Sequence, residues 1–433
     1  MNATKVARKL RIRMGRFSGD LSEGLCVAAK RFVSQMVYGI QAAESVLLTE
    51  ISRTLEEGIA LDKTEERLSR NLQRAELEAT IQDNLLKMAA SRVGEDTLLI
   101  VDPSDLSKKY AKKMEYLATV RDGSAHDLAQ GYWTLHIAGC GLDTDGMVPL
   151  YQRLWSAKAP DFTSENDEIL RGIDAVAKHV GRRGLWIMDR GGDRINLFSP
   201  ILDRKLRFLF RLVGNRNLIQ GGQTMLAEQV ALKCPLLHSM PIVRVEDGEE
   251  KTHVLRFGFR RVRLPEREEP LCLLVVHGLG AEPLMLLTNE PLNRSFKCLW
   301  RMVRAYLKRW SIEETIRYAK TCYDLENVRV LNYQGLQNLM PLVLAAMYFA
   351  ACVLDHDQRL RVMAAYVEKA AKRLFGIADF KYYALADGMR ALFARNPGAP
   401  VARILTRSSK EIPVHFFASS RINTVDLRWF APV

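Results

Sequence analysis

The chain has 433 residues, of which 48% are hydrophobic and 26% are charged, a composition typical of a folded globular protein and not of a disordered or fibrous one. Its length exceeds that at which single cores stop growing, so we expect two or three packed units. The formal net charge of +13 favours a polyanionic partner such as nucleic acid. The longest apolar stretch, 341–354, is shorter than the roughly 18–20 residues of a membrane-spanning helix, so we expect no membrane partner.

The seven cysteines are scattered along the chain and none forms a C-x-x-C pair, so the sequence suggests neither a disulfide framework nor a zinc ribbon. They are typical of reduced thiols, which indicates a cytoplasmic protein. The first 16 residues carry six basic side chains, and no acid precedes Asp20. This segment is expected to be either a basic arm or an ordinary solvated tail.

Residues 19–95 contain no proline and show apolar residues at three- and four-residue spacing, which predicts an all-helical region. A helix ending near Glu57, a turn over 58–61 and a capping box formed by Asp62 and Glu65 are compatible with a helix-turn-helix. The second helix carries basic residues on one face that could enter a DNA groove or simply be solvated: Arg67, Arg70 and Arg74.

From residue 97 the pattern changes to short apolar strands. Strands are expected at 97–102, 131–140, 147–155, 185–189 and 206–214, with a helix over 164–180 that begins at a Ser164 cap. Residues 215–292 contain further strand-like runs separated by Asp-Gly and proline turns, and the pattern then returns to amphipathic helix as far as about 395, before a polar and aromatic tail. The sequence therefore predicts an α/β fold.

Two of the predicted strands end in an acid, Asp102 and Asp189. Carboxyl ends of strands in α/β folds gather at one edge of the sheet, where sites lie, so these carboxylates could share a cleft. The alternative is structural: Asp102 would cap the turn at Pro103, and Asp189 would pair with a nearby arginine.

The predicted helix over 304–326 carries one acid between basic groups. Its residues at three- and four-residue steps share a face: Tyr306, Arg309, Glu313, Arg317 and Lys320. A carboxylate that holds a cation, flanked by groups that hold phosphates, suits phosphoryl chemistry. An ordinary surface helix with many ion pairs is the alternative. Glu314 lies about 100° round the helix from Glu313.

The spacing Tyr306-x2-Arg309-x3-Glu313-x6-Lys320 reproduces the Y-(2)-R-(3)-E-(6)-K signature and so resembles the DDE transposases of the insertion-sequence-four group. The resemblance covers about 97–330. It implies an RNase H-like catalytic core interrupted by a β-rich insertion, with helical N-terminal and C-terminal regions. The implied parts are a DNA-binding helical region 1–95, a first core part 96–214, the insertion 215–292, a core helix 293–331 and a helical C-terminal region with tail 332–433 that serves dimerisation.

By position, the resemblance makes Asp102, Asp189 and Glu313 the catalytic, metal-binding residues. Asp105 is the alternative to Asp102, but only Asp102 ends the apolar strand. Three carboxylates can bind two divalent ions, and oxygen-only ligands favour Mg²⁺ or Mn²⁺. The expected DNA contacts are Tyr306, Arg309, Arg317, Lys320, Lys108, Lys109, Arg190, Arg67, Arg70 and Arg74.

The resemblance implies cleavage of double-stranded DNA at the ends of an insertion sequence and transfer of the 3′-hydroxyl ends to target DNA, by a homodimer that holds paired ends and acts at the bacterial nucleoid. Two other functions remain open: a metal-dependent DNA nuclease without strand transfer, and a catalytically silent DNA-binding relic. The sequence contains no G-x-x-x-x-G-K-[ST] loop and no H-E-x-x-H motif, which argues against ATP-driven or zinc-hydrolase chemistry.

Overall fold

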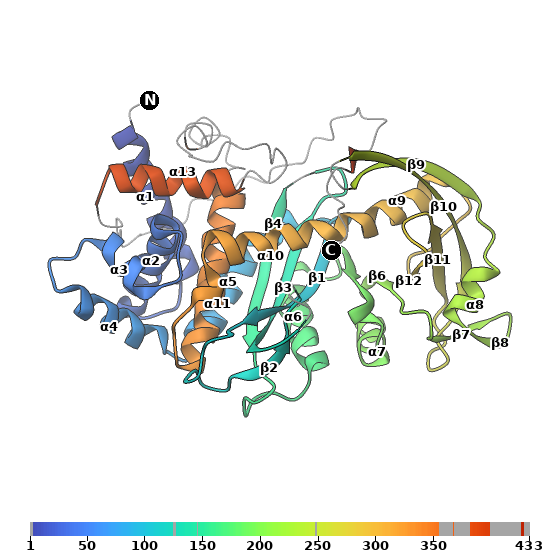
Figure 1. Ribbon diagram of the computed structural model, residues 1–433, viewed down its shortest axis with the longest axis horizontal. Coiled ribbons are helices and arrows are strands. Elements are labelled where there is room, and N and C mark those ends of the chain that lie inside the picture. The colour runs from blue at the N-terminus through green and yellow to red at the C-terminus, as the bar shows by residue number, and fades with distance from the viewer. Residues whose placement is uncertain are drawn as a thin grey trace. The chain divides into compact units, whose positions relative to one another are not determined.

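The computed structural model describes residues 3–123, 127–144, 146–246, 249–354, 367, 382–398 and 426–427 (Figure 1). The chain divides into two compact units. Unit 1 comprises Met1–Val93, Val101–Gly181 and Ser311–Ser409, and unit 2 comprises Gly94–Ile100, Arg182–Trp310 and Lys410–Val433. Most of the helix expected between 354 and 381, and most of the expected tail, lie outside the described residues.

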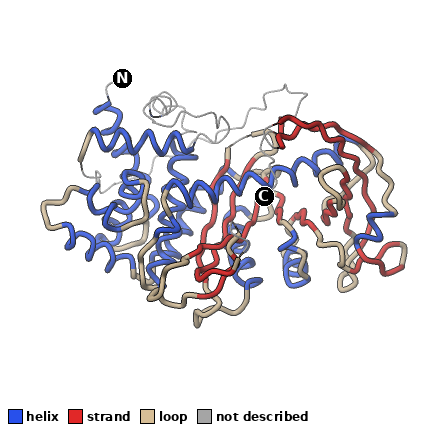
Figure 2. The backbone as a smooth tube through the Cα atoms, viewed as in Figure 1, coloured by secondary structure: helices blue, strands red, loops and turns tan. Residues whose placement is uncertain are grey.

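The first part of unit 1 is all-helical, as predicted (Figure 2). The helices are α1 Ala3–Leu21, α2 Val27–Ala43, α3 Leu48–Leu55, α4 Leu61–Leu72 and α5 Leu77–Ala89, followed by a 3₁₀ turn η1 Ala90–Arg92. The expectation of a basic arm or solvated tail at the N-terminus is wrong. Val6, Leu10 and Met14 recur at helical spacing and are buried, so the segment packs as the amphipathic helix α1.

The junction between α3 and α4 differs from the sequence prediction. Helix α4 begins after an N-cap at Ala60 that makes no side-chain capping bond, so the capping box expected at Asp62 is wrong. Asp62 already lies in the first turn of α4, and Glu65 accepts a hydrogen bond from the Thr49 hydroxyl at 3.0 Å. Glu65 therefore ties α4 to α3 and does not cap its own helix.

The strands that lie wholly in unit 1 are β2 Ala118–Arg121, β3 Leu128–Cys140 and β4 Met147–Trp155; β3 pairs antiparallel with both β2 and β4. Helix α6 Glu165–Val180 follows β4. The Ser164 hydroxyl accepts from the Asp167 N–H, so the predicted cap is confirmed. A Cβ at Gly172 would stand 2.5 Å from a Leu135 methyl group, so this glycine allows α6 to pack closely on β3.

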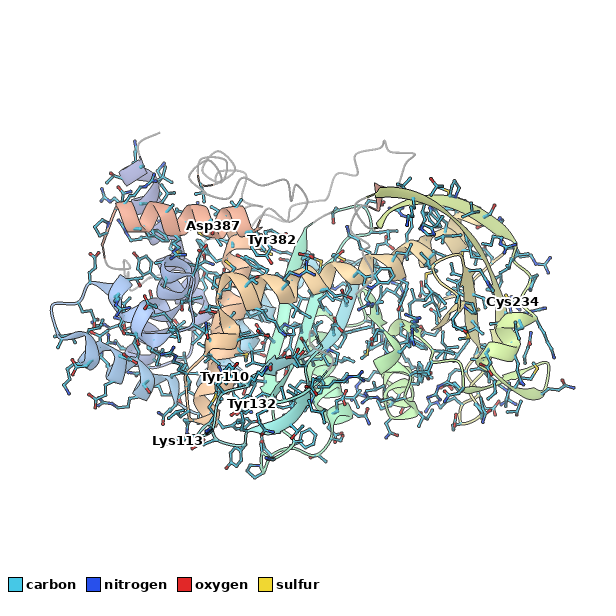
Figure 3. The ribbon with its side chains drawn as sticks, in the orientation of Figure 1. Tyr110, Lys113, Tyr132, Cys234, Tyr382 and Asp387 are labelled. Atoms are coloured by element: carbon cyan, nitrogen blue, oxygen red, sulfur yellow. The ribbon has the colours of Figure 1, made fainter. Side chains whose placement is uncertain are left out.

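The apolar C-terminal part of unit 1 forms its core. Helix α11 Tyr333–Tyr348 continues as a π-helix η5 over Phe349–Leu354. This stretch of 22 residues contains an 18-residue window with a mean hydropathy of 1.7. It is long and apolar enough to cross a membrane, contrary to the estimate from 341–354 alone, but 94% of that window is buried inside the protein. Helix α13 Tyr382–Arg395, which carries Tyr382 and Asp387 (Figure 3), packs on α1 and α2. Unit 1 also contains α10 Ser311–Cys322 and the 3₁₀ turn η4 Leu325–Asn327.

Unit 2 is built on a sheet that begins with the first residues of β1. Leu98, Leu99 and Ile100 of β1 pair in parallel with Leu185, Trp186 and Ile187 of β5. The strand order from there is β1, β5, β6, β12, β11, β10 and β9, with β5–β6 parallel and the later pairs antiparallel. The bounds are β5 Leu185–Met188, β6 Arg207–Arg211, β9 His238–Glu246, β10 Glu249–Val262, β11 Leu271–His277 and β12 Leu284–Thr288.

Smaller elements complete unit 2. They are the 3₁₀ turn η2 Arg190–Gly192, α7 Ile195–Asp203, the hairpin β7 Asn217–Gln220 and β8 Gln223–Leu226, α8 Ala227–Leu232, α9 Phe296–Leu307, η3 Lys308–Trp310 and β13 Asp426–Leu427 beside β9. The predicted mixed α/β class is confirmed. Antiparallel strands precede α6, the parallel strands β5 and β6 follow it, and a β-rich stretch separates β6 from α9.

Candidate active site

The first acid lies inside a strand and not at its end. Strand β1 runs from Leu98 to Ser107, so the expectation that it stops at Asp102 is wrong. Pro103 has no N–H to donate, but the β5 ladder has already ended at Ile100, so the proline interrupts no bond of that ladder. Because side chains alternate along a strand, Asp102 and Asp105, three residues apart, are expected on opposite faces of β1.

Asp105 is buried, and the fold uses its charge. Its Oδ1 lies 3.7 Å from the Lys320 Nζ and accepts a hydrogen bond from the Gly123 N–H at 3.3 Å. Asp102 is only half-buried. Of the two acids considered for the first catalytic position, Asp102 is therefore the more accessible and Asp105 is part of the internal ion pairing of unit 1.

The second acid directly follows a buried strand, as predicted. Strand β5 ends at Met188, and Asp189 caps the η2 turn by accepting the Gly191 N–H at 2.8 Å. Asp189 is half-buried and Arg190 is exposed. The last registered pair between β1 and β5 is Ile100 with Ile187. Asp102 and Asp189 each lie two positions beyond the last pair of the β1–β5 ladder.

The signature motif does not lie on one continuous helix, and that expectation is corrected. Helix α9 ends at Leu307, the 3₁₀ turn η3 covers Lys308–Trp310, and α10 begins at Ser311. Tyr306 is on α9, Arg309 is in the turn and Glu313 is on α10. A 3₁₀ turn has about 3.0 residues per turn instead of 3.6, so the shared face expected from Tyr306 through Glu313 does not follow. From Glu313 through Arg317 to Lys320 the helical spacing holds.

In unit 2 the signature tyrosine is buried, with 1% of its surface exposed. Burial raises the pKa of Tyr306, the charges of Arg309 and Arg211 lower it, and the charge of Asp189 raises it. The Arg309 guanidinium lies 6.0 Å from the Tyr306 ring centroid and 5.7 Å from that of Trp310. Tyr306, Arg309 and Trp310 form one aromatic and cationic cluster, and Tyr306 is close enough to Asp189 to sense its charge.

In unit 1 the predicted catalytic glutamate is exposed. Glu314, its neighbour, is half-buried and forms an ion pair with Arg317. Lys320 pairs with Asp105 at 3.7 Å and with Glu326 at 3.1 Å. Two of the basic residues expected to flank Glu313 towards DNA therefore have carboxylate partners of their own.

A buried histidine lies near the same lysine. Burial, with a smaller effect from the Lys320 charge, lowers the pKa of His136 to about 3, so the ring is neutral at pH 7. The His136 Nε2 lies 3.0 Å from the Thr134 hydroxyl, which in turn donates to the Ser104 carbonyl oxygen at 3.0 Å. These bonds link β3 to the part of β1 that carries Asp102 and Asp105. The sequence analysis did not single out His136, because a lone histidine in a strand carries no spacing signal.

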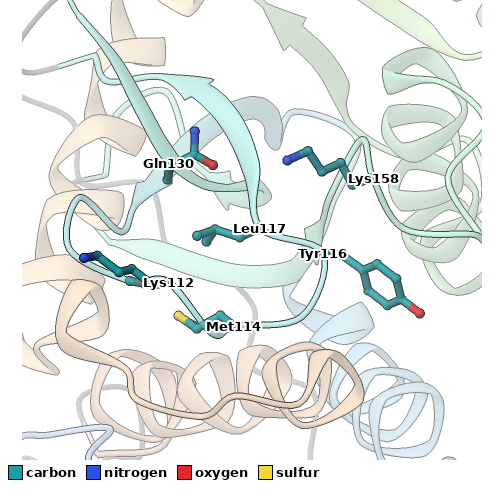
Figure 4. Close-up of a pocket in the computed structure, with 7 residues that line it drawn as sticks. Lys112, Met114, Tyr116, Leu117, Gln130 and Lys158 are labelled. Atoms are coloured by element: carbon teal, nitrogen blue, oxygen red, sulfur yellow. The ribbon is translucent and has the colours of Figure 1, made fainter.

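The basic segment after β1 divides into one internal lysine and several external ones. The Lys108 ammonium donates to the carbonyl oxygens of Glu326 and Val328 at 2.6 and 2.7 Å, and its burial lowers the pKa. Lys109 is exposed. Next to this segment lies an open pocket of about 750 Å³. Lys112 and Lys158 stand in it on opposite sides of Leu117 (Figure 4). Its lining is Ala111, Lys112, Met114, Tyr116, Leu117, Gln130 and Lys158, so no predicted catalytic carboxylate belongs to it.

The three arginines expected on a groove-binding helix have different environments. Arg67 binds the Glu57 carboxylate at 2.6 Å and the Gln35 side chain at 2.8 Å. Arg74 lies beyond the end of α4 and donates to Asn71 at 3.0 Å. Arg70 is exposed. Groove binding by this helix remains a prediction.

The residue types expected at the catalytic centre fit a hard divalent cation, because all three are carboxylates and Mg²⁺ and Mn²⁺ prefer oxygen ligands. Asp102 and Glu313 belong to unit 1, and Asp189 belongs to unit 2. Within the described ranges, no group of three or more His, Cys, Asp and Glu side chains is arranged to hold a metal ion. The metal-binding set therefore remains a prediction.

Comparison with known proteins identifies the family. The chain is similar to the piggyBac transposase in a synaptic complex with hairpin DNA, at 11% sequence identity and a TM-score of 0.41, over 91% of this chain and 79% of that one. A comparison with curated proteins gives no significant match. The family model described as "Transposase DDE domain" matches residues 94–349, a range that contains Asp102, Asp189 and Glu313. The chain therefore belongs to the DDE-domain transposase family.

Proposed function

We propose that this chain is a transposase of the insertion-sequence-four group that cuts DNA at the ends of its own insertion sequence and joins the released 3′ ends to target DNA. The observation that carries the proposal is the position of the residues within the family match. Residues 94–349 include the complete signature Tyr306, Arg309, Glu313 and Lys320 and both strand aspartates.

We assign Asp102, Asp189 and Glu313 to the binding of two Mg²⁺ or Mn²⁺ ions. When bound, such a pair supplies Lewis-acid activation of a water or 3′-hydroxyl and stabilisation of the leaving oxygen. Three features of the chain support the assignment. Asp102 and Asp189 each stand two residues beyond the last pair of the β1–β5 ladder, and both are half-buried, whereas Asp105 is buried. Glu313 is exposed on α10.

DNA is the proposed partner, held mainly through its phosphates. Lys109, Arg190 and Arg70 are exposed and can reach a phosphate directly. The other assigned contacts have partners within the fold and would position the site as well as contact DNA: Tyr306, Arg309, Arg317, Lys320, Lys108, Arg67 and Arg74. We further propose a homodimer on paired ends, acting at the nucleoid in the cytoplasm.

The test is cleavage of a labelled duplex that carries the DNA flanking the gene, with Mg²⁺, with Mn²⁺ and with EDTA. Glu313→Gln is compared with Glu314→Gln, which changes the adjacent acid that pairs with Arg317. Site-specific nicking that EDTA and Glu313→Gln abolish, and that Glu314→Gln retains, supports the assignment. Equal loss in both variants would point to a general effect on α10.

A second arm separates the transposase from a metal-dependent nuclease. A pre-cut end with a free 3′-hydroxyl is supplied with a plasmid target, and joined product is measured. Joining supports the transposase, and cleavage without joining supports the nuclease. Specific binding with neither reaction in either metal would make the protein a DNA-binding relic.

A further inference from the structure

Helix α1 has two sharply different faces. One face is buried and carries Val6, Leu10, Met14, Phe17 and Leu21. At about 100° per residue, these side chains fall within an arc of roughly 80°. This face packs on α2, α5 and α13, all in unit 1. The apolar half of α1 is therefore fully used by the fold.

The opposite face is basic. Lys5, Arg8, Lys9 and Arg16 are exposed, within an arc of about 100°. Lys5 and Arg16 are 11 positions apart, or about 17 Å at 1.5 Å per residue. No ion pair is found for any of these four among the described residues, and no acid lies on α1 before Asp20. This set is called the α1 basic face below.

The stability of the helix does not explain these charges. The first turn of α1 contains no acid, and Lys5, Arg8 and Lys9 lie in its first two turns, at the positive end of the helix dipole. Cations there are unfavourable, and the four repel one another. A bound polyanion would reverse both effects.

We propose that the α1 basic face binds the phosphate backbone of double-stranded DNA. The inference rests on the proposed function, since it supplies that site with a non-specific hold on its substrate. An anionic membrane is disfavoured, because a helix that binds a bilayer inserts its apolar face, and the apolar face of α1 is buried in unit 1. The helix expected from the sequence to enter DNA was α4, where Arg67 is bound to Glu57.

The experiment measures affinity of the full chain for a duplex of unrelated sequence as a function of salt. The α1 variant combines Lys5→Gln, Arg8→Gln, Lys9→Gln and Arg16→Gln. The control variant removes four basic residues that each neighbour a carboxylate, by Arg53→Gln, Lys87→Gln, Lys178→Gln and Arg301→Gln. Both lose four charges. Circular dichroism melting establishes that each is folded.

We expect the α1 variant to lose at least tenfold in affinity at low salt, and its log–log salt slope to fall by up to about 3.6, or about 0.9 for each phosphate contact removed. The control variant should change the slope by less than one unit. An unchanged slope in the α1 variant, equal losses in the two variants, or α1-dependent binding of phosphatidylserine vesicles in place of DNA would overturn the proposal.

The outcome is separable from that of the proposed function. Cleavage at low salt and saturating protein should survive in the α1 variant and be lost in Glu313→Gln. Conversely, Glu313→Gln should retain the wild-type salt slope. If the wild-type protein bound DNA through α1 and never cleaved it, the proposed catalytic function would be refuted, but the proposed DNA-binding surface on α1 would be supported.

Discussion

The Lys320 ammonium lies 3.7 Å from the Asp105 carboxylate and 3.1 Å from that of Glu326. Lys320 is the last residue of the signature, and the side chain of Asp105 is nearly buried, with 10% exposed. Removing one partner from such a pair leaves an uncompensated charge in the protein interior. The signature lysine therefore contributes to folding in unit 1, and DNA contact alone does not describe its role.

We predict that Lys320→Met lowers the free energy of unfolding by roughly 1–3 kcal/mol, because Asp105 loses its cation. Urea denaturation measures the change. Adding Asp105→Asn to Lys320→Met should recover part of the loss, because the buried charge is then gone. Arg317→Met, which breaks the more exposed pair with Glu314, should cost less than about 1 kcal/mol. A lysine that served DNA alone would leave the unfolding curve unchanged.

Substitutions of the two aspartates of β1 should have different effects on cleavage and on stability. Asp102→Asn is expected to abolish metal-dependent cleavage, with a change of less than about 1 kcal/mol in stability, because the side chain is half-buried and its carboxylate is assigned to the ions. Asp105→Asn should lower stability by about 1–2 kcal/mol and leave cleavage measurable. Stability comes from urea curves and cleavage from the nicking assay. The reverse pattern would make Asp105 the first catalytic acid.

Glu44 should make the protein less stable as pH rises. Burial raises the pKa of Glu44 to about 7 against the partly compensating bond from Arg390 at 3.0 Å, and Asp387 raises it further. The folded state therefore binds the proton more tightly than the unfolded chain does. The stabilisation is complete below the unfolded pKa of 4.5 and is lost as pH rises through about 7, amounting to about 3 kcal/mol.

The measurement is the difference in melting temperature between the wild type and Glu44→Gln from pH 4.5 to 8. The wild type should fall relative to the variant across this range, since glutamine does not titrate. Glu50→Gln, an exposed acid on α3, is the matched control and should track the wild type. A constant difference between wild type and Glu44→Gln would refute the assignment.

The sequence predicted well what depends on local periodicity. Asp189 follows a buried strand because LWIM offers only apolar side chains to both faces, and Ser164 caps α6 because a serine followed by acids suits a helix start. Helix α7 was missed because it has only nine residues and contains Pro200, although its polar residues share one face. Strand β2 has only four residues, too few for alternation to be recognised.

The errors at the candidate site share one cause: tertiary contacts that no local pattern encodes. Strand β1 continues past Pro103, which lies beyond the end of its ladder with β5, and the pattern of residues along one strand cannot reveal where that ladder ends. The turn η3 interrupts a sequence that is helical by every local measure. The pairing of Asp105 with Lys320 joins residues more than 200 positions apart, and no local pattern along β1 shows that Asp105 is buried while Asp102 is half-buried.

His136 should limit stability on the acid side. Its pKa is lowered to about 3 from an ordinary 6.5, mainly by burial and also by Lys320. The unfolded chain therefore takes up the proton more readily than the folded one. The stabilisation is fully present above about pH 6.5 and is lost as pH falls toward 3, by an amount on the order of 5 kcal/mol.

His136→Gln retains a polar group for the Thr134 hydroxyl and removes the titration. We expect the wild type to be the more stable protein at pH 7 and to lose that advantage progressively between pH 6.5 and 4, as followed by urea unfolding at each pH. His277→Gln, at the end of β11 in unit 2, serves as the control and should parallel the wild type. If the advantage of the wild type stayed constant down to pH 4, the folded and unfolded states would take up the proton equally, and the pKa of His136 would not be lowered by folding. The assignment of a neutral His136 ring would then be wrong.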